Sequence, residues 1–93
     1  MRESTIEAYL RDRVKELGGK AYKFVSPGNT GVPDRLVCLP GGRVVFVELK
    51  TPGKKPTALQ LSQQRKLAEL GFLTLNLDSK QKIDAEIAIW KEV

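Results

Sequence analysis

The chain has 93 residues, enough for one domain, and carries 16 Lys and Arg against 11 Asp and Glu, a formal net charge of +5. This excess of positive charge fits a polyanionic partner. The sequence contains no histidine, which excludes histidine-based zinc sites, Ser-His triads and histidine-dependent nucleases. No apolar run approaches the roughly 20 residues that span a bilayer, and no signal-peptide core is present, so we expect no membrane association.

A helix is the first predicted element. Ser4-Thr5-Ile6-Glu7 matches a capping box, in which a hydroxyl and a glutamate side chain satisfy the first turn. Apolar residues then recur at helical spacing until the pattern stops at Gly18-Gly19. We therefore expect a helix over about residues 4–17, followed by a short strand over residues 21–25 and a loop over residues 26–32.

The next two segments predict an antiparallel hairpin. Residues 35–39 and 43–50 are rich in apolar and β-branched side chains, and Pro40-Gly41-Gly42 between them is typical of a turn. If these three residues form the loop, Asp34 lies opposite Glu48. A two-residue loop would instead place Asp34 opposite Leu49, diagonal to Glu48.

The second half of the chain predicts a loop, a helix, a strand and a final helix. Thr57 with Gln60 caps a helix that ends at Gly71, and its apolar residues Leu59, Leu67 and Leu70 are expected to face inward. A strand follows over residues 72–77, and a closing helix begins at Asp78-Ser79. The element order is α-β-β-β-α-β-α, and we expect residues 1–93 to form a single α/β domain.

Asp34, Glu48 and Lys50 are the candidate site. Directly opposed strand residues have Cβ atoms roughly 4.5–5.5 Å apart, so one cation can take an oxygen from each carboxylate. Strand alternation returns Lys50 to the face of Glu48. Two close carboxylates repel each other unless they hold a proton or a cation. Mg²⁺, with Mn²⁺ as a substitute, would polarise a phosphate and activate water, which is the chemistry of phosphodiester hydrolysis.

An alternative interpretation is that these charges form a solvated stripe on a sheet. The surrounding strand argues against it, because Val45, Val47 and Leu49 mark one face as buried while Phe46 marks the other as partly buried. A strand that is apolar on both faces lies inside a sheet. Charged residues at its end then require a partner, a cation or a ligand.

Three motifs carry a resemblance to a known family. Gly31-Val32-Pro33-Asp34, Phe46-Val47-Glu48-Leu49-Lys50, and a downstream helix with Leu59 and Gln63 resemble the VRR-NUC branch of the PD-(D/E)xK nuclease superfamily. The resemblance implies a restriction-endonuclease-like core with a mixed β-sheet flanked by helices. It also implies a standalone, phage-like homodimer that resolves Holliday junctions, with DNA rather than a small molecule as substrate. The single cysteine, Cys38, excludes an internal disulfide, so we expect the protein in a reducing host cytoplasm.

The family pattern assigns roles to individual residues. Asp34 and Glu48 are the implied metal ligands, the Leu49 carbonyl is a third, and Lys50 is the implied catalytic lysine. Glu7 has two interpretations, a further metal ligand or only the capping residue of the first helix. Gln63, expected on the inner side of its helix, is the implied partner of the lysine or of a substrate phosphate.

DNA contacts are expected around the rim of this site. Each candidate residue is individually expected at a solvated surface unless the candidates cluster. The candidates are Lys23, Ser26, Gly28, Gly31, Arg35, Lys54 and Lys55. Flap or restriction-like cleavage and a non-catalytic nucleic-acid-binding module remain alternatives to junction resolution. The intact Asp34, Glu48 and Lys50 set favours catalysis.

Overall fold

The computed structural model describes residues 2–92 as three helices and four strands in the predicted order. In chain order the elements are α1 (Glu3–Glu16), β1 (Lys20–Lys23), β2 (Arg35–Leu39), β3 (Arg43–Leu49), α2 (Ala58–Glu69), β4 (Leu73–Leu77) and α3 (Lys80–Lys91). Among residues 2–92, no helix combines the length and apolar content needed to cross a bilayer. The predicted α/β architecture is therefore confirmed.

One mixed sheet organises the molecule, with strand order β1-β2-β3-β4. The β1–β2 and β2–β3 pairs are antiparallel, whereas β3 and β4 run parallel and are connected through α2. Leu39 pairs with Arg43 across the turn. This register is that of the three-residue loop, and it excludes the alternative in which Asp34 faces Leu49.

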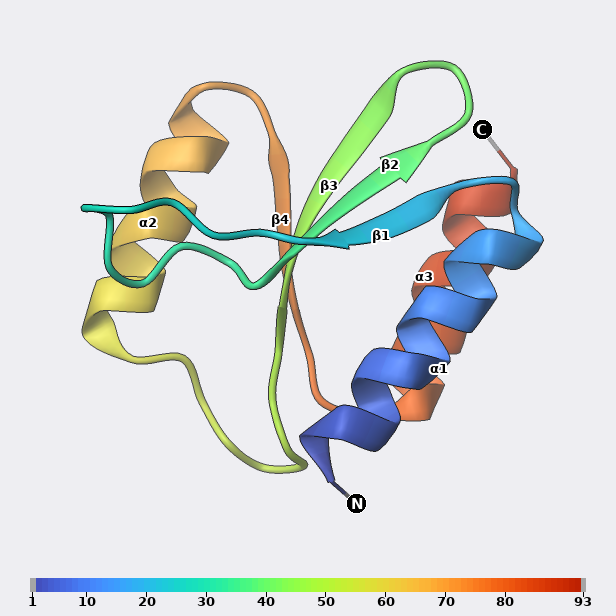
Figure 1. Ribbon diagram of the computed structural model, residues 1–93, viewed down its shortest axis with the longest axis horizontal. Helices are drawn as coiled ribbons and strands as arrows, with labels where there is room; N and C mark the ends of the chain where they lie inside the picture. The colour runs from blue at the N-terminus through green and yellow to red at the C-terminus, as the bar shows by residue number, and fades with distance from the viewer. Residues whose placement is uncertain (1, 93) are drawn as a thin grey trace.

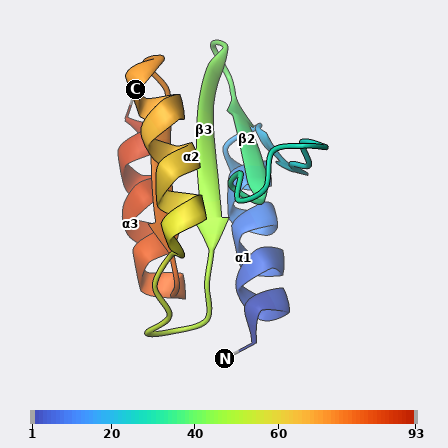
Figure 2. The ribbon, with the colours of Figure 1, turned by 90° about the vertical axis from the view of Figure 1, so that its left-hand side faces the viewer.

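The two faces of the sheet are covered differently (Figures 1 and 2). Figure 2 shows α2 in front of the sheet and α1 and α3 behind it. In Figure 1 the same helices lie to the left and right of the strands. Strand alternation directs Val45, Val47 and Leu49 toward α1 and α3, where they join the main apolar core. The α2 face instead receives Phe46 and Glu48.

The α1–α3 side of the sheet holds the main apolar core. Ile6, Leu10 and Val14 of α1 and Ile83 of α3 are fully buried, and Ile87 and Trp90 of α3 are nearly so. Their spacing of three or four residues places them on one stripe of each helix. The apolar periodicity read from the sequence therefore sets how these two helices pack.

Two local predictions were wrong. The first helix begins at Glu3 with Arg2 as the N-cap, and no side chain caps it. The Thr5 and Ile6 amides donate to the Arg2 carbonyl instead, so the expected capping box from Ser4 to Glu7 does not form. Because the helix begins at Glu3, earlier than expected, backbone hydrogen bonds already satisfy the amides of Thr5 and Ile6.

The second wrong prediction concerns the face of α2. Leu59 and Leu70 are 59% and 74% exposed, and Gln64 is the buried residue of this helix at 7% exposure. The Gln64 side chain exchanges hydrogen bonds of 2.8 and 2.9 Å with Asn76 of β4. Amide contacts, rather than an apolar stripe, therefore fix the rotation of α2 against the sheet.

Candidate metal-binding active site

Asp34 and Glu48 lie together where the β2–β3 ladder ends. Arg35 and Val47 form its last pair, so the next step places Asp34 opposite Glu48. The Asp34 Oδ1 atom accepts a hydrogen bond of 3.2 Å from the Leu49 amide. Glu48 is only 5% exposed. The predicted convergence of two carboxylates is therefore present, on the α2 face of the sheet.

Both carboxyls resist ionisation in this setting. Burial, followed by the charge of Glu48, raises the pKa of Asp34 from 3.8 to about 6. Burial also raises the pKa of Glu48, against the opposing effect of the Lys50 amine. Two carboxylates this close repel each other unless they hold a proton or a cation. The electrostatics are therefore compatible with a bound cation.

Lys50 completes the site from the same face. Its Nζ atom lies 3.3 Å from Glu48 Oε2, and its side chain is only 18% exposed. Its backbone amide donates a 3.0 Å hydrogen bond to the Leu77 carbonyl, which holds the end of β3 against β4. Lys50 is thus held at its backbone by Leu77 and at its amine by Glu48.

A glutamine of α2 contacts the Glu48 carboxylate, but it is Gln60 and not Gln63. Gln60 Nε2 donates a 3.0 Å hydrogen bond to Glu48 Oε2. The Gln60 Oε1 atom accepts from the Thr57 amide, and the predicted capping box at this helix is confirmed. Gln63 instead donates to the Thr30 carbonyl at 3.3 Å. Gln60 was identified in the sequence only as a cap, although its place at the first turn of the helix brings it to Glu48.

The acidic residues of α1 divide between two sides of the site. Glu7 forms an ion pair with Arg35, and Arg35 faces α1 on the opposite side of β2 from Asp34. This contact does not support Glu7 as a ligand. The charge of Glu3, one helical turn earlier, raises the pKa values of both Asp34 and Glu48. This contribution is smaller than that of burial, and Glu3 itself is exposed.

Gly31 connects the loop before β2 to α2. Its φ is +93°, and a Cβ at this position would lie 2.9 Å from the Leu59 carbonyl carbon. Only glycine fits such a close backbone approach. The Gly-Val-Pro-Asp motif therefore fixes Asp34 by packing its loop onto α2, and Gly31 has a structural role besides the predicted phosphate contact.

The predicted DNA-contacting residues are not equivalent in the structure. Arg35 is 8% exposed and paired with Glu7, so its position does not support an external contact. Lys23 and Gly28 are exposed, and Ser26 accepts a 2.9 Å hydrogen bond from the Asn29 side chain. These three residues remain predictions.

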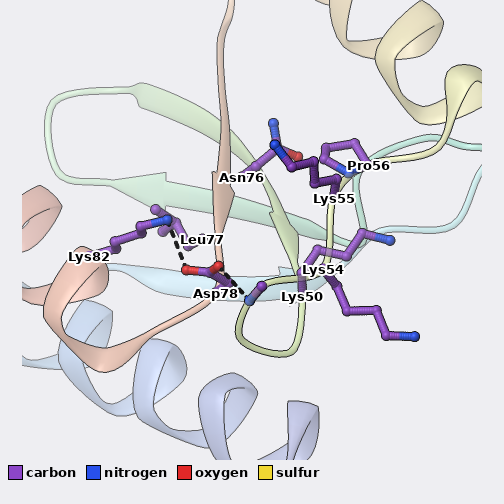
Figure 3. Close-up of a pocket in the computed structure, with 9 residues that line it drawn as sticks. Lys50, Lys54, Lys55, Pro56, Asn76, Leu77, Asp78 and Lys82 are labelled. Atoms are coloured by element: carbon purple, nitrogen blue, oxygen red, sulfur yellow. Dashed lines mark hydrogen bonds and ion pairs between the residues drawn. The ribbon is translucent and has the colours of Figure 1, made fainter.

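Lys54 and Lys55 do cluster with the site. They line a cavity of about 310 Å³ that Lys50 also lines, together with residues of β4 and α3 (Figure 3). The loop after β3 thus carries two lysines that line the same cavity as Lys50. The assignment of Lys54 and Lys55 to nucleic-acid binding stays a prediction.

Comparisons with known proteins identify the family. No family model matches the sequence. A phage protein, "Putative nuclease p44" of Acyrthosiphon pisum secondary endosymbiont phage 1, is 54% identical over 80 residues, which cover 86% of each chain. A solved structure described as a VRR_NUC domain superposes with a TM-score of 0.88 at 32% identity, covering 92% of this chain and 94% of that one. This chain belongs to the VRR-NUC family.

The VRR-NUC site has the donors that a hard divalent cation requires. Asp34 and Glu48 supply carboxylate oxygens, the preferred ligands of Mg²⁺, which also retains several waters. Within residues 2–92, no group of three or more His, Cys, Asp or Glu side chains is arranged to hold a metal. A cation bound there would take its remaining ligands from backbone carbonyls, water or substrate. The predicted Leu49 carbonyl fits this requirement and stays a prediction.

Proposed function

We propose that this VRR-NUC protein is a Mg²⁺-dependent, structure-selective DNA endonuclease that resolves Holliday junctions as a homodimer. The observation that carries the proposal is the carboxylate pair of half-buried Asp34 and buried Glu48, with the Lys50 amine 3.3 Å from Glu48. Family membership adds support, as does the naming of a 54% identical phage protein as a nuclease.

The proposed roles follow from the contacts of each side chain. Asp34 and Glu48 would hold the cation through their carboxylate oxygens. Mg²⁺ bound there would polarise a phosphoryl oxygen and lower the pKa of a bound water. Lys50 orients the attacking water or neutralises charge that develops on the phosphate. Gln60 positions Glu48 through its amide hydrogen bond.

A junction resolvase needs two such sites. A four-way junction is resolved by cuts in two strands, whereas each chain contributes one carboxylate pair, so a symmetric dimer suits the substrate. Strand β1 lies at an edge of the sheet, and Tyr22 and Val25 beside that edge are 47% and 67% exposed. We propose this edge as part of the dimer surface. The free Cys38 is compatible with the reducing cytoplasm of a bacterial host.

The test is to offer purified protein a panel of labelled four-way junction, flap, duplex and single-stranded DNA. Each substrate is incubated with Mg²⁺, with Mn²⁺ and with EDTA, and sedimentation measures the mass of the protein. We expect paired, symmetric cuts in the junction with either metal, no cuts in EDTA, and the mass of a dimer.

The other outcomes separate the alternatives. Cleavage only at flaps would replace resolution by flap processing. Cuts at one sequence in duplex DNA would indicate a restriction-like enzyme. Binding to all four substrates without products, in either metal, would show that the chain is a non-catalytic nucleic-acid-binding module.

A further inference from the structure

A basic cavity lies directly beside the candidate active site. It is lined by Lys50, Gly53, Lys54, Lys55, Pro56, Asn76, Leu77, Asp78 and Lys82. Four of these residues are lysines and one is an aspartate, which gives the lining a formal charge of +3. Lys50 belongs to both this cavity and the carboxylate cluster, so an anion in the cavity would lie next to a phosphate at the metal.

Asp78 is the one acid of this cavity, and its two oxygens are both engaged. Oδ1 lies 3.0 Å from Lys82 Nζ, and Oδ2 accepts a 3.2 Å hydrogen bond from the Gly53 amide. These two contacts hold the pKa of Asp78 below its usual value, with Lys82 the larger cause. Figure 3 shows Lys82 reaching Asp78 from one side, while the lysine-bearing loop after β3 lies on the other.

This arrangement ties the loop to the rest of the fold. The segment between Lys50 and Pro56 has no regular structure apart from a turn closed by the Lys54 amide and the Thr51 carbonyl at 3.0 Å. The Asp78–Gly53 hydrogen bond fastens that turn to the end of β4. Lys54 and Lys55 follow Gly53 directly, so this hydrogen bond fixes the backbone from which their side chains extend.

The lysines retain the capacity to bind an anion. An ammonium has three N–H donors, so the contact between Lys82 and Asp78 leaves two for a ligand. Among the described residues 2–92, neither Lys54 nor Lys55 has an ion-pair partner within 4.0 Å. A phosphodiester oxygen is the acceptor that fits such a cluster next to a phosphate-cleaving centre.

We propose that this cavity is a second phosphate site, which holds the phosphodiester next to the scissile one on the same strand. Lys54, Lys55 and Lys82 supply the charge, and Asp78 acts as a positioning residue that orients the loop and Lys82. The inference rests on the proposed nuclease function for the identity of the scissile phosphate. It adds a site that fixes the strand in register with Lys50.

The first experiment measures binding alone and does not depend on cleavage. Affinity for a labelled four-way junction in EDTA is measured against salt for wild type, K54Q, K55Q, K82Q and the control K91Q. Lys91 is on the same helix as Lys82 but nine residues further, about 14 Å along the axis. We expect each cavity variant to lower the salt slope by about one and K91Q to leave it unchanged. Equal slopes for K82Q and K91Q would overturn the site.

Removing the Asp78 side chain tests its role, because positioning and simple charge predict opposite changes in DNA affinity. D78A removes a negative charge, so long-range electrostatics alone would strengthen DNA binding. If Asp78 positions the loop, D78A weakens binding several-fold, while D78N, which retains an acceptor for the Gly53 amide, binds more tightly than D78A. Stronger binding by D78A than by wild type would refute the positioning role. Circular dichroism checks that both variants fold.

A neutral phosphate locates the contact on the DNA. Single methylphosphonate linkages are placed at the positions flanking the mapped cut, and cleavage is compared between wild type and a K54Q/K55Q variant. We expect one flanking substitution to slow wild type about tenfold and to add little to the defect of the variant. Additive effects at both flanking positions would refute the second site. If wild type cuts no DNA, the proposed function fails, and the salt slopes still decide whether the cavity binds a phosphate.

Discussion

The two faces of the sheet differ in the kind of residue that they bury. On the α1–α3 face, Leu10, Val14 and Ile83 are fully buried and belong to the main apolar core. On the α2 face, the buried residues include Glu48 and Gln64, which are held by amide hydrogen bonds. One face is therefore built for burial of apolar surface, and the other for holding polar groups in defined positions.

The difference shows where a small fold can accommodate unfavourable electrostatics. Burying Asp34 beside Glu48 disfavours their charged forms, and α2 returns little apolar burial because Leu59 and Leu70 point to solvent. An aromatic cluster compensates in part, since Phe46 packs against Phe24 and Phe72 with ring centroids 5.5 and 5.4 Å apart. We infer that the opposite core supplies most of the stability that the site requires.

The largest expected effect lies on the α2 face and is on activity alone. D34N and K50A should each lower junction cleavage in Mg²⁺ by about a thousandfold or more, because several kcal/mol of transition-state stabilisation are lost. Circular dichroism and junction binding in Ca²⁺ should stay near wild type, as they should for the exposed controls D12N and K66A. If either site variant cut at the wild-type rate, the site assignment would be wrong.

On the α1–α3 face, substitutions should change the free energy of unfolding. Leu10→Ala empties a fully buried position of α1 and should lower the free energy of unfolding by about 2–5 kcal/mol. Leu70→Ala, at a position 74% exposed after α2, should change it by about 0.5 kcal/mol or less. Urea unfolding measures both. Similar losses for the two variants would show that the α2 face contributes to stability as much as the core does.

The contrast between the faces also explains what the sequence could predict. Helical periodicity in α1 and α3 and the hairpin turn encode apolar burial and register, so the core, the element order and the meeting of Asp34 with Glu48 followed from local pattern. The same rule failed on α2, where Leu59 and Leu70 were expected inward. Long-range amide pairs with β3 and β4 set that helix, and such pairs have no local periodic signature.

The site residues were also predictable only in part: those on the strands followed from local pattern, and those held by contacts between distant segments did not. Strand alternation was enough to place Lys50 beside Glu48. Choosing Gln60 rather than Gln63 as the partner of Glu48 required the rotation of α2. The role of Asp78 depends on a contact between a loop and β4 that are separated by a whole helix.

The two glutamines offer a sharper test of the α2 face. Gln60→Glu keeps an oxygen for the Thr57 amide, so the helix cap survives, but it replaces the amide donor to Glu48 with a negative charge. Loss of such a supporting contact should lower metal affinity or the cleavage rate about 10–100-fold. Gln63→Glu should have little effect, because Gln63 contacts the Thr30 carbonyl. A larger loss at Gln63 than at Gln60 would restore the original sequence-based assignment.

The smallest expected effect is on stability at the site itself, in metal-free protein. The folded state holds the Asp34 proton with a pKa of about 6, against 3.8 in the ordinary case. Because the folded state binds this proton more tightly, the free energy of unfolding falls as the pH rises from about 4 to about 6, and the loss persists above that range.

Asp34→Asn should therefore stabilise the protein at pH 7, on the order of 1–2 kcal/mol after a reduction for solvent screening at this half-buried group. Urea unfolding in EDTA between about pH 4 and 8 measures the effect, with exposed Asp12→Asn as the control. Saturating Mg²⁺ should reverse the order, since only the wild type gains stability from the cation. An Asp34→Asn variant that is no more stable than wild type in EDTA would show that the two carboxyls do not oppose folding.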